Sequence, residues 1–290
     1  MKWLNRNNDT SNFEDRRGRR GKSIAIGGVG GIIVILLALF LGQDPGKMMD
    51  MANSVAGGDG NSQESVDPEK AHAYEEWKDF TLGVFNSCND VWSKIFREEL
   101  KQEYTKPTLV AFTDQTTSAC GGASASMGPF YCPADTKVYI DLSFFKELAE
   151  RFKAPGDLAM AYVTAHEVGH HVQNLLGISD KLHSMRGRIS DKEYNRLSVK
   201  LELQADFFGG LWAHYADKMG IIKLEEGDLE SAIAAAQAIG DDALQKAAQG
   251  YTVPDSFTHG TSAQRVYWFK KGFVTGDFSQ GDTFGDTSLN

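Results

Sequence analysis

The residues with the clearest chemical meaning form the run HEVGH at 166–170, an H-E-x-x-H pattern. On a helix, residues four apart share a face, so His166 and His170 can direct their imidazoles at one metal ion. Glu167 follows directly and can take a proton from a water at that metal. The flanking residues are small or apolar, as a buried helix requires. The sequence therefore predicts a metal centre on a buried helix.

A catalytic zinc needs a third protein ligand, since such sites hold the ion with three side chains and leave one position open. In the otherwise apolar stretch LELQADFFGGLW, Glu202 and Asp206 lie four residues apart and share a helical face. Burying two carboxylates is costly unless they are paired or bound to metal. We expect Glu202 to be the third ligand and Asp206 to orient a ligating histidine by accepting a hydrogen bond from its outward nitrogen. A solvated helix face is the alternative, which the upstream histidines disfavour.

Periodic apolar residues predict the elements that would position these side chains. Helices are expected over 69–103, 143–152, 158–176, 190–219, 228–249 and 256–271, and strands over 108–112 and 137–142. The predicted fold class is α+β, mainly helical, with a small sheet before the active-site helix.

Two cysteines could be joined by a disulfide. Cys120 and Cys132 flank the Gly/Ser-rich stretch GGASASMGPFY, which reads as a turn with its ends close together. An oxidising compartment permits such a bond.

Charge is unevenly distributed along the 290 residues. The net charge is −9, but residues 1–22 carry +4, so the remainder carries −13. An acidic body argues against nucleic-acid binding, which needs a basic surface. Residues 23–42 are uncharged, mostly apolar and long enough to span a bilayer. The preceding basic residues predict a cytoplasmic N-terminus, and we expect an uncleaved anchor instead of a cleaved signal peptide.

Five segments follow from these patterns. They are a cytoplasmic basic N-terminus (1–22), a transmembrane helix (23–42), a flexible linker (43–68), the catalytic domain (69–276) and a flexible tail (277–290). The expectation is a single-pass protein of a bacterial inner or cell membrane, with its catalytic domain periplasmic or extracellular.

The chain resembles known zinc metallopeptidases. H-E-x-x-H followed by E-x-x-x-D on a second helix is similar to the gluzincin type, and E-x-x-A-D at 202–206 resembles its membrane-associated members. More closely, the chain resembles the YpfJ-like family of bacterial neutral zinc metallopeptidases. The matching features are the Arg-rich start before one apolar span, CGG at 120–122, GPFYCP at 128–133, VYIDL at 138–142, HEVGHHVQ at 166–173 and ELQAD at 202–206. The resemblance implies a zincin-like domain, a bound Zn²⁺ and peptidase activity.

The same resemblance directs attention to His259. The segment HGTSAQR at 259–265 has the form H-x-x-S-x-x-R, similar to a late motif of membrane-associated gluzincins, with Gly260 where those have proline. Peptide hydrolysis needs a donor to the developing oxyanion, and His259 is the candidate. A histidine that only caps the last helix is the alternative.

We therefore predict a membrane-anchored zinc endopeptidase acting on envelope proteins or peptides. His166, His170 and Glu202 would hold Zn²⁺, and Glu167 would accept the proton of the attacking water and deliver it to the leaving amine. The strand at 138–142 could bind an extended peptide at a sheet edge, or be an ordinary core strand. The alternative function is a zinc-stabilised binding or quality-control factor with little proteolysis. The intact Glu167 favours the enzyme.

Overall fold

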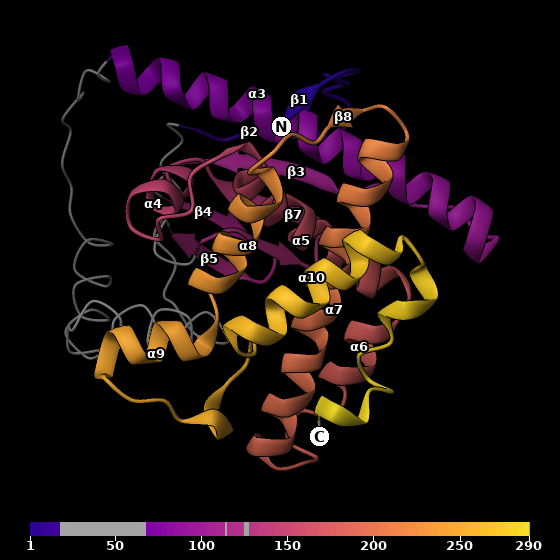
Figure 1. The fold of residues 1–290 in the computed structure, drawn as a ribbon, viewed down its shortest axis with the longest axis vertical. Helices are drawn as coiled ribbons and strands as arrows, with labels where there is room; N and C mark the ends of the chain where they lie inside the picture. Colours follow the sequence, from indigo (N-terminus) through magenta and orange to yellow (C-terminus); the bar gives the residue numbers. More distant parts are fainter. Residues whose placement is uncertain (18–67, 114, 125–127, 290) are drawn as a thin grey trace.

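The computed structural model describes residues 1–17, 68–113, 115–124 and 128–289. Within them the chain is mainly helical with small sheets (Figure 1). The α-helices are α3 (Pro68–Ile95), α4 (Phe144–Glu150), α5 (Asp157–Leu175), α6 (Ile178–His183), α7 (Asp191–Lys218), α8 (Asp228–Ala238), α9 (Asp241–Gln249) and α10 (Ser262–Thr275). The strands are β1 (Lys2–Trp3), β2 (Phe13–Asp15), β3 (Thr108–Phe112), β4 (Gln115–Ser118), β5 (Gly121–Ser124), β6 (Phe130–Cys132), β7 (Lys137–Asp141) and β8 (Ile222–Lys223). Shorter turns are the π-helical η1 (Phe96–Leu100) and the 3-10 segments η3 (Pro254–Ser256), η4 (Phe278–Gly281) and η5 (Thr287–Leu289).

The largest sheet has the strand order β2-β3-β7-β6. The first three strands run parallel, and β6 pairs antiparallel with β7 at one edge. Side chains alternate between the faces of a strand, so Leu109 and Val138 pack with the helices while Val110 and Tyr139 form a smaller cluster on the other face. Because β7 is paired on both sides, the predicted strand at 137–142 is a core strand, and the edge strands of this sheet among the described residues are β2 and β6.

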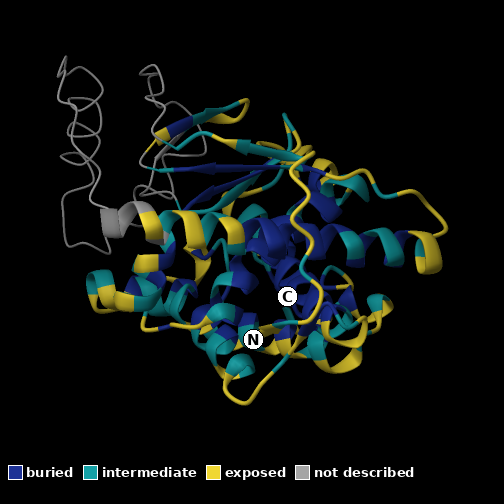
Figure 2. Cartoon of the chain, turned by 90° about the horizontal axis from the view of Figure 1, so that it is seen from above, coloured by how far each residue is buried: buried dark blue, intermediate teal, exposed yellow. Residues whose placement is uncertain are grey.

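The helices that carry the predicted site pack at the centre of the molecule. Figure 2 shows buried residues gathered between the sheet and the helices. Helices α7 and α10 meet backbone to backbone at Gly210, where a Cβ atom would lie 2.0 Å from the carbonyl oxygen of Phe269. Only glycine permits this approach. Asp206 and Arg265 each lie one turn from the crossing, so the same contact brings their side chains together.

The N-terminal segment corrects the predicted fold class and localisation. Its strand β1 pairs with β8, and β2 pairs with β3 inside the largest sheet. A membrane span at 23–42 would put these partners on opposite sides of a bilayer. In the described ranges no helix is both long and apolar enough to cross a membrane, and 23–42 lies outside those ranges. The predicted single-pass protein, with a cytoplasmic N-terminus and its body across the membrane, is therefore wrong.

Several smaller differences separate expectation and structure. The Ala-rich segment at 228–249 forms two helices, α8 and α9, instead of one. The predicted turn between Cys120 and Cys132 contains β5, which pairs with β4 just before it, and leads into the edge strand β6. The predicted tail contains η4 and η5, and Thr283 within it is fully buried. All but the last residue of the predicted linker at 43–68 lies outside the described residues.

Candidate metal centre

Two helices bring three metal-binding side chains together. His166 and His170 lie on α5, Glu202 lies on α7, and their candidate ligand atoms all fall within 4.8 Å of one another. The two Nε2 atoms are 3.2 Å apart, and the Glu202 carboxylate oxygens lie 3.2 Å from His166 Nε2 and 3.5 Å from His170 Nε2. Ligands about 2.0–2.1 Å from a tetrahedral zinc are separated by roughly 3.3 Å. The donor set and its spacing fit zinc.

The outward nitrogen of His166 is held by Asp206. His166 Nδ1 is 2.8 Å from Asp206 Oδ1, and the carboxylate is fully buried. Asp206 also accepts hydrogen bonds from Tyr162 Oη at 2.5 Å and from Arg265 Nε and Nη2 at 2.8 and 2.9 Å. Since a carboxylate only accepts, Nδ1 carries the proton of the neutral ring. The lone pair of His166 Nε2 then faces the other two donors, as metal binding requires.

The outward nitrogen of His170 is held by an amide chain. Gln173 Nε2 donates to the carbonyl oxygen of Leu201 at 2.6 Å and to Gln204 Oε1 at 3.1 Å. Its Oε1 therefore faces His170 Nδ1, at 2.9 Å, as an acceptor. Gln204 Nε2 in turn donates to the carbonyl oxygen of Gly281 at 2.8 Å. Both imidazoles thus have a fixed tautomer with Nε2 directed at the site.

The electrostatic field of the site favours a cation. Burial lowers the pKa of His166, but Asp206 and Glu202 outweigh it and raise that pKa to about 10. Burial also lowers the pKa of His170, and the Glu202 charge more than offsets it. Burial raises the pKa of Glu202, but His170 and His166 hold it well below its usual value. Negative potential that stabilises imidazolium would equally stabilise a bound metal ion.

Glu167 lies beside the two histidines. It follows His166 on α5, is 8% exposed, and its charge is among the causes that raise the pKa of His170. The carboxylate is thus close to the donor set without belonging to it. This is the position that a general base at the metal would need.

His259 lies on the loop before α10, near enough to Glu202 for each charge to shift the pKa of the other. Asp241, at the start of α9, accepts hydrogen bonds from the backbone N–H groups of Thr258, His259 and Gly260 at 2.8, 2.6 and 3.0 Å. Its other oxygen lies 3.2 Å from His259 Nδ1. Burial lowers the pKa of His259, whereas Asp241 and the nearby Glu202 raise it above its ordinary value.

The helix-cap alternative for His259 does not hold. Thr261 is the N-cap of α10 and forms a capping box with Gln264. Gly260 has a φ of 88°, which proline cannot adopt because its ring fixes φ near −65°. The loop conformation therefore explains why glycine stands where the resembling motif has proline.

The sequence prediction missed three residues that organise this site. Arg265 and Tyr162 both bind Asp206, and Gln173 binds His170. Helical spacing could have found two of them, since Tyr162 precedes His166 by four residues and Gln173 follows His170 by three. Arg265 belongs to the H-x-x-S-x-x-R pattern, but that pattern does not indicate that Arg265 pairs with Asp206.

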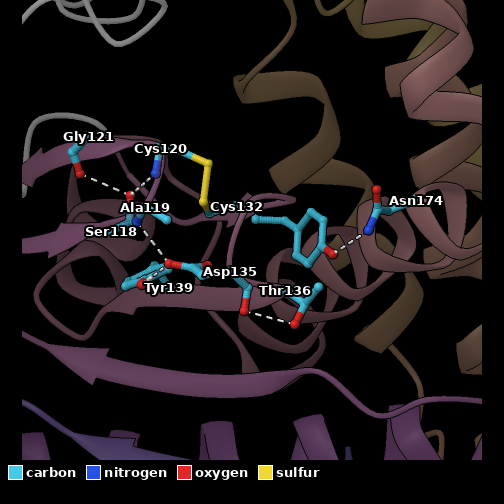
Figure 3. Close-up of a disulfide and its surroundings, with 10 residues drawn as sticks. Ser118, Ala119, Cys120, Gly121, Cys132, Asp135, Thr136, Tyr139 and Asn174 are labelled. Carbon is cyan, nitrogen blue, oxygen red and sulfur yellow. Dashed lines mark hydrogen bonds between the residues drawn. A yellow bond between two sulfur atoms is a disulfide. The ribbon is translucent and has the colours of Figure 1, made fainter.

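The predicted disulfide is confirmed. Cys120 and Cys132 are bonded, with an S–S distance of 2.02 Å. The bond joins the turn of the β4–β5 hairpin to the last residue of β6 (Figure 3). It therefore fixes the edge strand nearest the metal-bearing helix.

The fold and the site define a class of helical proteins in which one helix supplies two histidines and a second supplies a carboxylate to one metal centre. The chain belongs to the family described as "Putative neutral zinc metallopeptidase", whose model matches residues 1–284. It is 44% identical over 292 residues to the uncharacterized protein YpfJ of Escherichia coli K12, covering 98% of this chain and 99% of that protein. It is 38% identical over 266 residues to an uncharacterized protein of Mycobacterium tuberculosis H37Rv, covering 87% and 86%. No solved structure matches.

Proposed function

We propose that this chain is a zinc-dependent endopeptidase. The observation that carries the proposal is the convergence of two Nε2 atoms and one carboxylate at separations of 3.2–3.5 Å, with each imidazole fixed from behind. The family description agrees with a peptidase.

A zinc ion held by His166, His170 and Glu202 would supply a Lewis acid that activates water and polarises a peptide carbonyl. Glu167 accepts the proton of the attacking water and passes it to the nitrogen of the leaving amine. His259, held at Nδ1 by Asp241, donates from Nε2 to the carbonyl oxygen as negative charge develops there. Its raised pKa favours the imidazolium, which carries a proton on both nitrogens.

The substrate is a peptide in extended conformation. Among the residues that the structure describes, β6 pairs with β7 on one edge and with no strand on its other edge, and it lies beside α5. A peptide that adds to this edge gains main-chain hydrogen bonds whatever its sequence. We infer a broad sequence tolerance, with selectivity left to side-chain contacts.

The test compares the full chain with Glu167→Gln and, as a matched control, Glu226→Gln, which alters an exposed loop carboxylate. Zinc content and cleavage of an unstructured protein are measured for all three. We expect stoichiometric zinc throughout, with cleavage reduced about 10²–10⁴-fold in Glu167→Gln alone.

Two outcomes would contradict the proposal. Stoichiometric zinc without cleavage by the unaltered chain would favour a zinc-stabilised binding factor. A chain that retains no zinc after exposure to the ion would exclude the metal centre itself.

A further inference from the structure

Strand β6 is poorly held by its own backbone. It contains three residues, and within the described part of the chain it pairs with β7 on one side only. Such a short edge strand forms few ladder hydrogen bonds, so its position must depend on side-chain contacts. Those contacts matter because the free edge of β6 is where the proposed substrate would lie.

Tyr131, the middle residue of β6, is bound to the helix that carries the metal ligands. Its hydroxyl accepts a hydrogen bond from Asn174 Nδ2 at 3.1 Å and lies 3.0 Å from His171 Nδ1. His171 Nε2 is 2.7 Å from the carbonyl oxygen of Thr105. Because a carbonyl only accepts, Nε2 carries the proton of the neutral ring and Nδ1 accepts from the Tyr131 hydroxyl. The Tyr131 hydroxyl, both His171 nitrogens and the Asn174 amide nitrogen therefore each have a defined role.

One turn of α5 carries both a residue of the metal site and a residue that contacts β6, because neighbouring side chains of a helix point in different directions. Consecutive helical residues point about 100° apart, so His170 faces the metal site while His171, 1% exposed, faces the strand. In β6 the neighbours of Tyr131 point the other way, into the small cluster with Tyr139. Only Tyr131 can therefore bind the strand to the helix.

We propose that Tyr131, His171 and Asn174, here called the tyrosine clasp, are positioning residues that fix the edge of β6 relative to the metal ligands. The inference rests on the proposed peptidase function. The disulfide at Cys132 anchors the next residue of the strand to the β4–β5 hairpin. Figure 3 shows the disulfide toward the left of the view and Asn174 toward the right. The disulfide joins β6 to the β4–β5 hairpin, whereas the clasp joins β6 to α5 and so fixes the distance between that strand and that helix.

The first test is kinetic and uses the zinc-loaded full chain. Tyr131→Phe removes one hydroxyl from the clasp. Tyr104→Phe is the matched control, because that hydroxyl donates to Asn89 and its ring lies 5.7 Å from the same His171 ring. We expect Tyr131→Phe to raise KM for long extended peptides about 3- to 10-fold, with kcat and zinc content unchanged. The control leaves KM unchanged. Equal effects of both substitutions, or a loss in kcat alone, would overturn the inference.

The second test does not depend on cleavage. Amide hydrogen exchange is followed in β6 and, for comparison, in the β3–β7 pair. We expect faster exchange in β6 for Tyr131→Phe by about 10-fold, and no change in β3–β7 or in the control. If the unaltered chain cleaves nothing, the proposed function fails while this result still decides whether the clasp holds β6. Unchanged exchange in Tyr131→Phe would refute the clasp.

Discussion

Asp206 is the residue on which the polar contacts of the site converge. It has no exposed surface, and its oxygens face four donor atoms, from His166, Tyr162 and Arg265. Burial raises the pKa of Asp206, but Arg265 and His166 outweigh it and hold the pKa below its usual value. The carboxylate therefore stays ionised, and its charge would act through His166 on a metal bound at the site.

Substitution of Asp206 should weaken zinc binding more than substitution of its neutral partner. Asp206→Asn keeps the shape but removes the charge, so we expect zinc affinity to fall about 10- to 100-fold. Tyr162→Phe removes one of the four donors and should have a smaller effect. Competition with a chelator at fixed pH measures both. If Asp206→Asn lowers the melting temperature but leaves zinc affinity intact, Asp206 serves the fold alone.

Residue spacing predicted the donor set and the carboxylate of Asp206 behind it, but not the pairing of Arg265 with Asp206. His166, His170, Glu202 and Asp206 follow from helical periodicity, because each pair lies four apart on one helix. The pairing of Arg265 with Asp206 depends on how two helices cross, and periodicity within a helix carries no information about that.

Helix packing sets the geometry of the site at the next scale. The approach of α7 to α10 at Gly210 allows Arg265 to reach Asp206 as a two-point contact. Helices separated by ordinary side chains lie about 8–10 Å apart. A wider crossing would lengthen both hydrogen bonds of the pair.

Adjacent glycines of α7 should respond differently to alanine. A Cβ at Gly210 would lie 2.0 Å from a backbone oxygen, whereas the nearest atom to a Cβ at Gly209 is 3.7 Å away, on Tyr162. We expect Gly210→Ala to lower the free energy of unfolding by about 3 kcal/mol. Gly209→Ala should be neutral or stabilising by up to about 1 kcal/mol. Urea denaturation distinguishes them, and similar losses in both variants would count against the close crossing.

Elements with strong local patterns were predictable, and those set by distant partners were not. The predicted 158–176 helix and 108–112 strand agree closely with α5 and β3. The split of 228–249 was missed because Asp241 starts α9 by binding the distant loop at 258–260. The strands β4 (QTTS) and β5 (GGAS) were missed because neither sequence shows apolar alternation.

At the scale of the whole molecule, the N-terminal segment is part of the folded body. The apolar run and its basic flank satisfied a local rule for membrane spans, but β2 pairs with residues about a hundred positions away. The window of about 19 residues used to recognise a membrane span does not contain both β2 and β3. The error in localisation came from this non-local pairing.

Packing of this segment can be tested by two neighbouring substitutions. Trp3 packs edge-to-face against Phe80 of α3, with ring centroids 6.0 Å apart, whereas Leu4 is 55% exposed. We expect Trp3→Ala to lower the free energy of unfolding by about 2 kcal/mol and Leu4→Ala to leave it nearly unchanged. Thermal unfolding provides the measurement. If Trp3→Ala leaves the free energy of unfolding unchanged, the N-terminal segment does not pack on the rest of the folded chain.

The pairing of β1 with β8 also dictates an order of events during synthesis. Lys2 pairs with Lys223, so β1 has no strand partner in β8 until more than two hundred further residues have been translated. At about 5–20 residues per second, this wait lasts roughly 10–40 s. Strand β1 must therefore pair with β8 after most of the chain between them has been made, whereas β2 can pair with β3 much earlier.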